Sequence, residues 1–276
     1  MTSHLERGFT YGILLLASVY AIYPLLSILF LALEPPGSLT SGLAIPTDPS
    51  FESFRRAWNE GGFAHALLSS FIITVSVVAA SVFLSILTAF AFGTMRFRGS
   101  SALFALLLVG VVVPWEATVY PLYYDAQRIG LSDSYLAVIL PQVGLSVAFG
   151  TFWLRAFFRS APRQLMDAAH VDGASTWTVL WRILVPIGRP AIVTLAILLF
   201  VFTWNDYLLA LVLIQDENTW TAPVALASFA GRQYDTAGLR EVVAASSVLV
   251  ALPILVVYIA LQRQFIRGLL TGAVKE

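Results

Sequence analysis

Long apolar stretches separated by short polar segments dominate this chain. Six of them have about 20 residues or more, the length at which an α-helix crosses a hydrocarbon core of about 30 Å. Prolines and glycines inside these stretches are compatible with membrane helices and predict kinks. The pattern therefore predicts an all-α integral membrane protein with six transmembrane helices, at roughly residues 11–33, 64–92, 101–123, 135–157, 191–214 and 242–262.

The first stretch resembles a secretion signal only superficially. It runs from Tyr11 to Leu33, which is longer than the apolar region of a signal peptide (about 7–15 residues), and no convincing small-x-small cleavage site follows it. We interpret it as an uncleaved first span. With no tandem repeat, low-complexity tract or sizeable soluble segment, we expect a single transmembrane domain over 1–276, with a core at 64–265, a polar loop at 158–190 and a tail at 266–276.

Composition supports a membrane protein and excludes several kinds of site. Hydrophobic residues make up 58% and charged residues 12%, whereas soluble proteins have about 45–50% and about 25%. The absence of cysteine excludes disulfides and thiolate metal sites. His4, His65 and His170 lie far apart and lack metal-ligand spacing. We expect no metal, no cofactor and no nucleic-acid partner for this chain, and a lipid bilayer around it.

Basic residues predict the orientation. Eleven of the 16 fall on one side of the predicted spans, in the N-terminus, at 93–100, around 158–190 and in the tail. The positive-inside rule places these regions, including both termini, in the cytoplasm. The eleven are Arg7, Arg96, Arg98, Arg155, Arg159, Arg163, Arg182, Arg189, Arg263, Arg267 and Lys275.

The polar loop contains a short predicted helix. Pro162 suits a first helical turn, with Ser160 or Ala161 before it as a cap. Gly173 supplies a stop, because glycine takes the left-handed conformation that ends helices. One face carries residues at i, i+3, i+4 and i+7, namely Leu165, Ala168, Ala169 and Asp172. The paired alanines make this face low and smooth, so we predict a docking helix that another protein approaches closely at the membrane surface.

A second helical run follows Gly173. Its apolar stripe consists of Trp177, Leu180, Trp181 and Leu184, and we expect Pro186 and Pro190 to break it.

Two segments on the outer side are long enough for a role of their own. The first, 34–63, contains a predicted amphipathic helix bearing Phe51, Phe54 and Trp58; the second is 215–240. Their aromatic residues either anchor the chain at the membrane interface or form a platform for an external partner.

The sequence contains no recognisable catalytic set. There is no G-x-x-x-x-G-K-[ST] phosphate loop, and the single lysine is Lys275. Clustered nucleophiles, bases and metal ligands are also lacking, so we expect a non-catalytic chain. If ATP energises transport here, another subunit must hydrolyse it.

Acidic residues near aromatic ones mark a candidate substrate pathway. Charges at membrane depth are costly, so they usually face a partner or a water-filled path. Aromatic faces stack on sugar C–H surfaces while carboxylates and amides bind hydroxyls, which suits a sugar. The candidate residues are Trp115, Glu116, Tyr120, Trp204, Asn205 and Asp206. The alternative is structural: Asp206 caps or bridges helices, and the tyrosines belong to the outer aromatic belt.

The polar loop and several other short motifs resemble those of a known family. Asp167 to Ala174, followed by Ile183-Leu184-Val185-Pro186, is similar to the "EAA…G…I.LP" loop of permeases in ATP-binding-cassette carbohydrate importers, specifically the six-span partner subunit of the maltose and glycerol-3-phosphate type. Asp167 replaces the usual Glu, which keeps the charge on a shorter arm. The likeness covers about 64–276 and includes Arg96 to Gly99, Ile129 to Leu131, Ile139 to Pro141, Trp204 to Tyr207, Leu261 to Arg263 and Gly268 to Lys275.

The resemblance implies a type I importer transmembrane fold whose loop is a cytoplasmic coupling helix. The residues it assigns to docking on the ATPase subunit are Asp167, Ala168, Ala169, Asp172, Gly173 and Ala174. It also gives the tail, Gly268 to Lys275, contact with the ATPase dimer, and the loop around Ser228 to Asp235 contact with a sugar-binding protein.

The implied function is inward transport of a sugar or sugar derivative across the bacterial inner membrane. The implied partners are a second, homologous permease forming a heterodimer, two ATPase subunits carrying ATP and Mg, and an extracellular or periplasmic sugar-binding protein. Specificity rests largely on the binding protein, so the sugar stays open. The alternative is a stand-alone secondary sugar transporter, which would ordinarily show more intramembrane charges or broken helices.

Overall fold

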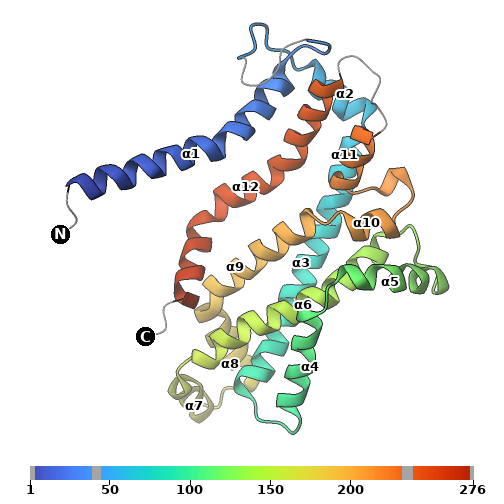
Figure 1. The fold of residues 1–276 in the computed structure, drawn as a ribbon. Helices are drawn as coiled ribbons and strands as arrows, with labels where there is room; N and C mark the ends of the chain where they lie inside the picture. Colours follow the sequence, from blue (N-terminus) through green and yellow to red (C-terminus); the bar gives the residue numbers. More distant parts are fainter. Residues whose placement is uncertain (1–3, 39–44, 232–238, 274–276) are drawn as a thin grey trace. The chain divides into compact units, whose positions relative to one another are not determined.

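The computed structural model describes residues 4–38, 45–231 and 239–273, which form helices joined by short turns (Figure 1). They divide into two compact units, each built from segments distant in sequence. The first unit is Met1–Leu67 with Ala222–Pro253; the second is Leu68–Thr221 with Ile254–Glu276. The prediction of a single domain over 1–276 stays a prediction.

The first unit holds α1 (His4–Leu33), α2 (Glu52–Glu60), α11 (Ala222–Gly231) and the beginnings of α3 (Phe63–Thr94) and α12 (Leu239–Ala273). Small residues such as Ala57 and Ala245 dominate its core, which lets helix backbones approach closely. Phe63 fills the remaining space and meets Phe229 edge-on, with ring centroids 6.1 Å apart. Most of α1, by contrast, exposes its apolar side chains, as a helix in contact with lipid or another subunit does.

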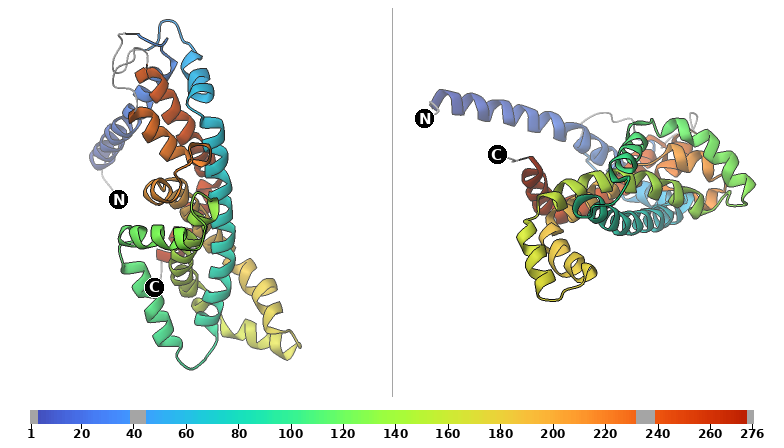
Figure 2. Two further views of the ribbon diagram at one scale, coloured as in Figure 1. Left: turned by 90° about the vertical axis from the view of Figure 1, so that its right-hand side faces the viewer. Right: turned by 90° about the horizontal axis from the view of Figure 1, so that it is seen from below.

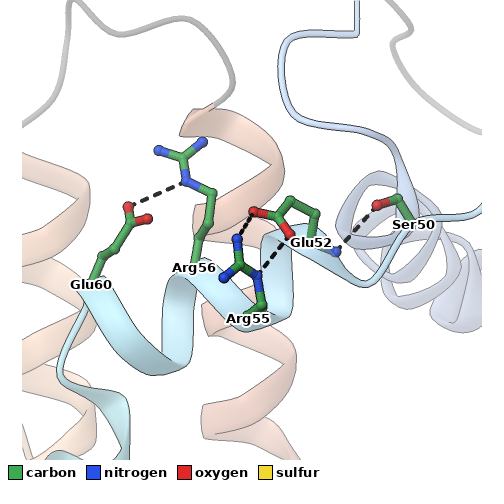
Figure 3. A network of polar contacts seen from close by, with 5 residues as sticks. All are labelled: Ser50, Glu52, Arg55, Arg56 and Glu60. Atoms are coloured by element: carbon green, nitrogen blue, oxygen red, sulfur yellow. Dashed lines mark hydrogen bonds and ion pairs between the residues drawn. The ribbon is translucent and has the colours of Figure 1, made fainter.

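Helix α2 is the amphipathic helix predicted in the first outer segment. Arg55 pairs with Glu52 at 2.6 Å and Arg56 with Glu60 at 3.2 Å (Figure 3). The Arg55 guanidinium donates hydrogen bonds to the Glu52 carboxylate, which lowers the pKa of Glu52. Before the helix, Ser50 Oγ accepts a hydrogen bond from the Glu52 N–H at 3.2 Å. Salt bridges this exposed contribute little stability, so α2 is held mainly by its buried face.

The second unit is built on α3, α6 (Tyr135–Ser160) and α9 (Val185–Trp204). Polar ties join these helices: Trp153 Nε1 donates to the Ala191 carbonyl at 3.1 Å, and the hydroxyls of Thr88 and Thr151 lie 2.6 Å apart. Arg155 donates to the Phe92 carbonyl at 3.1 Å, and its guanidinium carbon lies 3.8 Å from the centroid of the Phe104 ring. The buried core between the helices includes Ala89, Leu154, Phe158, Leu184, Leu195 and Leu199.

Shorter elements complete the second unit. They are α4 (Ser100–Val112), α5 (Glu116–Arg128), α7 (Arg163–Val171), α8 (Thr176–Val179), the π-helical turn η1 (Leu180–Leu184), α10 (Leu208–Leu213) and the 3₁₀ turn η2 (Glu217–Thr219). Figure 2 shows from two further sides how α7 and α8 extend from the ends of α6 and α9.

The spans agree with the prediction in number, with two corrections. The predicted span at 191–214 corresponds to the helical stretch Thr176–Trp204, after which Leu208–Leu213 form the separate helix α10. In the described part of the chain, five helices are long and apolar enough to cross a membrane, and a sixth span results if α4 and α5 are counted together. These two helices are bent by 97°, so the predicted span at 101–123 is broken. Pro114 lies at the break, because a proline has no N–H to continue the helical hydrogen bonds.

The predicted break at Pro186 and Pro190 is wrong, because Thr176–Trp204 is one helical stretch. The wide π-helical turn η1, in which the Val185 N–H donates to the Leu180 carbonyl, directly precedes Pro186. Pro186 itself stands in the first turn of α9, where a missing N–H is tolerated. Pro190 lies inside α9, as prolines in membrane helices can.

Gly150 sets the closest approach of α6 to its neighbours. A Cβ there would lie 2.8 Å from Ser85 Cβ and 3.1 Å from Leu195 Cδ2. We predict that Gly150→Ala destabilises the protein by about 1–3 kcal/mol through overpacking. The measurement is thermal or denaturant unfolding of the purified protein in detergent.

Gly144 is the matched control on the same helix, since a Cβ there meets nothing within 4 Å. Gly144→Ala should be neutral or stabilising, by up to about 1 kcal/mol from helix propensity. Adding Ser85→Gly to Gly150→Ala should recover part of the loss. Equal stability of the two single variants would show that the contact at Gly150 is not tight.

Candidate functional site

A cavity of about 750 Å³ lies within the second unit. Its walls come from the junction of α4 and α5, one face of α6, the end of α9 and the start of α10. Two interruptions of helices therefore meet at one space: Val113–Trp115 between α4 and α5, and Asn205–Tyr207 between α9 and α10. Figure 1 shows the helices that these segments join, α4 with α5 and α9 with α10, together with α6.

Local hydrogen bonds satisfy much of the backbone at both interruptions. The Val113 N–H still donates to Val109 at 3.0 Å, and both the N–H and the hydroxyl of Thr118 donate to the Trp115 carbonyl, at 3.0 and 2.6 Å. At the second interruption, the Asn205 side chain donates to the Val201 carbonyl at 2.8 Å, and the Asp206 N–H donates to the Thr203 carbonyl at 3.2 Å. Short polar side chains thus stabilise chain breaks that apolar surroundings would otherwise penalise.

Asp133 ties the turn before α6 to the end of α10. It is a residue other than glycine with a positive φ, 57°, which presents its side chain across the turn. Its carboxylate accepts hydrogen bonds from the N–H groups of Gln215 and Asp216, and its own N–H donates to the Leu213 carbonyl at 3.2 Å. The Gln215 side chain reaches Tyr123 on α5 at 3.4 Å. These bonds fix the wall that α5 and α10 contribute to the cavity.

One face of α6 supplies the opposite wall. Its lining residues are spaced i, i+3, i+4 and i+7, which places them on a single stripe: Gln142, Leu145, Ser146 and Phe149. Gln142 is only 8% exposed, and its Oε1 has no hydrogen-bond partner among the described residues. Sequence reasoning missed this stripe, although a glutamine and a serine one turn apart inside an apolar span were the available signal.

Asp206 lies between α9 and α10 and meets this stripe at Gln142. Its carboxylate has the N–H groups of Leu209 and Ala210 and the side chain of Gln142 as hydrogen-bonding neighbours. Its buried Oδ2, however, finds no partner in the described part of the chain. The structural role proposed for Asp206 as an alternative is thus compatible with the cavity role, because one carboxylate serves the start of α10 and also lines the cavity.

Of the six residues predicted for the substrate pathway, four line the cavity: Trp115, Glu116, Asn205 and Asp206. The other two do not. Tyr120 is exposed and bonds through its hydroxyl to that of Tyr124 at 2.9 Å. Trp204 is 2% exposed and stacks on Phe200, with centroids 5.6 Å apart, so it belongs to the core behind the cavity wall.

The predicted docking helix is α7, and Pro162 occupies its N-cap position rather than its first turn. Its end has a Schellman motif: Gly173, at φ +79°, donates to the His170 carbonyl at 3.0 Å, and the Ala174 N–H donates to the Ala169 carbonyl at 2.9 Å. The ring of His170 also contacts the Ala174 carbonyl, with Nδ1 and O 3.1 Å apart. These contacts give α7 a defined end at the predicted residue.

The six predicted docking residues have two different environments. Asp167, Ala168 and Asp172 are exposed on α7 and its C-cap. Ala169 and Ala174 instead pack partly against the core of the second unit, and Gly173 supplies the left-handed turn. The first three are therefore available to a partner, whereas the other three shape the loop.

The structure describes only part of each of the two other predicted contact segments. The tail at 266–276 is helical as far as Ala273, but its side chains and residues 274–276 lie outside the described residues. The predicted loop around Ser228 to Asp235 begins in α11, and residues 232–238 are outside as well.

Comparison with known proteins identifies the family. Residues 56–271 match the family of binding-protein-dependent transport system inner membrane components. The chain belongs to this family. It is 35% identical over 256 residues to the trehalose transport system permease protein SugB of Mycobacterium tuberculosis, covering 93% of each chain. It is also 31% identical to the melibiose/raffinose/stachyose import permease protein MelC of Bacillus subtilis, over 95% of this chain and 96% of the relative.

Solved structures support the transport-system fold. A chain of a bacterial ABC transporter involved in the import of the acidic polysaccharide alginate superposes with a TM-score of 0.82 at 24% identity, covering 96% of this chain and 99% of that one. This likeness supports the fold alone. As an inner membrane component of such a system, the chain is a membrane subunit, and the stand-alone secondary transporter is not favoured.

The glycine at the end of α7 gives a test of this geometry. A Cβ at Gly173 meets nothing within 4 Å, so any effect of substitution comes from its φ of +79°. We predict that Gly173→Ala weakens the end of α7 by about 1–2 kcal/mol. Hydrogen exchange at the amides of residues 173 and 174 should become faster. Gly173→Asn is the control, because Asn tolerates this conformation, and equal exchange in both variants would argue against a strained position.

Proposed function

We propose that this chain is a permease subunit of an ATP-binding-cassette importer that moves a sugar inward, driven by ATP hydrolysis on a separate subunit. The observation that carries the proposal is α7: an exposed nine-residue helix with a Schellman motif at its C-terminus, too short to cross a bilayer, beside the end of α6. A helix this short is marginal by itself, so its defined ends indicate a rigid contact element.

A continuous helix connects this contact element to the cavity. After the turn at Gly173, Ser175 caps α8 by accepting the Thr178 N–H at 3.2 Å. From Thr176 the helix continues to Trp204, immediately before Asn205 and Asp206 in the cavity wall. At about 1.5 Å per residue, these 29 residues span about 43 Å. A displacement of α7 would therefore be transmitted along one element to the substrate path.

The partners follow from what this chain lacks and from its family. We propose two ATPase subunits, carrying ATP and Mg, that dock on Asp167, Ala168 and Asp172. A second, homologous permease completes a heterodimer, and an external sugar-binding protein delivers the substrate. From the distribution of basic residues we propose that both termini and α7 lie in the cytoplasm of a bacterium, with the spans in its inner membrane.

A sugar as substrate is supported by the named relatives and by the cavity lining. The name of one relative includes trehalose, and that of the other includes melibiose, raffinose and stachyose. Trp115, Phe149 and Tyr207 offer ring faces in the cavity, and Asn205 and Asp206 offer polar groups for hydroxyls. Large rings beside a few fixed polar groups are typical of small-molecule sites.

We predict that Ala168→Arg uncouples the importer. Ala168 is exposed, so an arginine fits the isolated chain but would obstruct a close-fitting partner. Copurification with the ATPase subunits, or ATP-dependent uptake in proteoliposomes, should fall by about tenfold or more, as for a contact worth at least about 1.4 kcal/mol. Asp167→Glu, which restores the family's usual residue, should keep uptake.

Ser101→Arg is the control, because Ser101 is also exposed and follows the basic turn at 93–100. It should leave uptake unchanged. Normal coupling in Ala168→Arg would exclude α7 as the docking helix. Accumulation of sugar on an ion gradient without any ATPase subunit would instead favour the secondary transporter.

A further inference from the structure

Two buried oxygen acceptors on the cavity residues find no hydrogen donor in the part of the chain that the structure describes. They are Oε1 of Gln142 on α6 and Oδ2 of Asp206 between α9 and α10. Leaving a buried acceptor unsatisfied costs about 1–3 kcal/mol, and more for a charged group. The side chain of Gln142 is hydrogen-bonded to Asp206, yet its Oε1 remains without a donor. Both oxygens are acceptors, so the missing group in each case is an O–H or N–H donor.

The charges around the cavity have one sign. Glu116 and Asp206 both line it, and no lysine or arginine is among the described residues of the lining. A phosphate or carboxylate on a substrate would face two carboxylates without a balancing cation. In surroundings of low polarity this repulsion is only weakly screened.

The rest of the lining suits uncharged sugar rings. Trp115, Phe149, Phe202 and Tyr207 bring aromatic groups to the cavity from three different segments. Ser146 and Thr203 add hydroxyls that can either donate or accept a hydrogen bond. Apart from the carboxylates, every lining group is thus compatible with a polyhydroxylated, uncharged molecule.

We propose that this cavity selects sugars that carry hydrogen donors and no negative charge, with Gln142 and Asp206 as the acceptors that enforce the selection. Neutral sugars and amino sugars are admitted, whereas uronates and phosphorylated sugars are excluded. The proposal rests on the proposed sugar-permease function and deepens it. It also separates this chain from the alginate importer whose fold it shares, because alginate is acidic.

The test measures binding to the assembled transport complex in lipid nanodiscs, without ATP or binding protein. Saturation-transfer NMR compares three matched probes: trehalose, trehalose 6-phosphate and trehalosamine. We expect binding of trehalose and trehalosamine, and binding of the phosphate weaker by about tenfold or more, which corresponds to about 1.4 kcal/mol. Equal or tighter binding of the phosphate would overturn the proposal, and so would binding of none of the three.

Variants assign the signal to the cavity. Gln142→Met keeps the volume but removes the acceptor, together with the hydrogen bond from Gln142 to Asp206, and should weaken trehalose binding by about tenfold. Asp206→Asn removes one negative charge with little change of shape, and should raise the binding of the phosphate relative to trehalose. Gln127→Leu, at an exposed position outside the cavity lining, is the control and should leave all three unchanged. Unchanged probe ratios in both cavity variants would place the selection elsewhere.

The two proposals fail in different ways. If the complex binds trehalose as expected but shows no ATP-dependent uptake of any sugar, the permease function is wrong and the selectivity of the cavity stands. If the complex imports a uronate or a phosphorylated sugar in an ATP-dependent manner, the function stands and the selectivity is wrong.

Discussion

Backbone polar groups inside a bilayer must find hydrogen bonds within the protein, and this constraint determines where a membrane helix can break. This chain breaks two helices, at Val113–Trp115 and at Asn205–Tyr207, and both breaks border the same cavity. Thr118 and Asn205 hydrogen-bond carbonyls there, and Asp206 serves the start of α10. Irregular backbone is tolerated where it lines a cavity. The cavity therefore accounts for the position of both breaks.

The same constraint makes the unbroken stretch from Thr176 to Trp204 informative. It contains Pro186 and Pro190, yet the turn η1 and the position of Pro186 at the start of α9 keep it continuous. Close packing fixes it to α6 through the Trp153 bond to the Ala191 carbonyl. A Cβ on Gly188 would lie only 3.1 Å from the ring of Phe158, so the two helices have little freedom to slide. Packed helices of this kind move as rigid bodies, which suits transmission of force from α7.

Sequence reasoning located most of the fold, because hydrophobic length alone identifies membrane helices. It also found the stop at Gly173, where only a few residue types accept a positive φ. It missed the severity of the break at Pro114 and the continuity through Pro186, since both depend on how neighbouring turns satisfy the backbone. Gln142 was missed for a different reason. A single glutamine scarcely alters the hydropathy of a span, and its environment is set by residues more than 60 positions away, such as Asp206.

The unsatisfied acceptors explain why a polar cavity persists in an otherwise apolar unit. Local interactions in natural proteins usually agree with the fold, and exceptions concentrate where function requires them. Asp206 accepts hydrogen bonds from the start of α10 and from the side chain of Gln142, so both residues have a structural role, but Gln142 Oε1 and Asp206 Oδ2 find no donor among the described residues. Water or a ligand hydroxyl could supply the donor that these oxygens lack among the described residues. Because Gln142 lies on α6 and Asp206 between α9 and α10, a ligand that donates to both would bridge α6 and the α9–α10 junction. In the proposed function, substrate binding would thereby be linked to the position of the helix that leads back to α7.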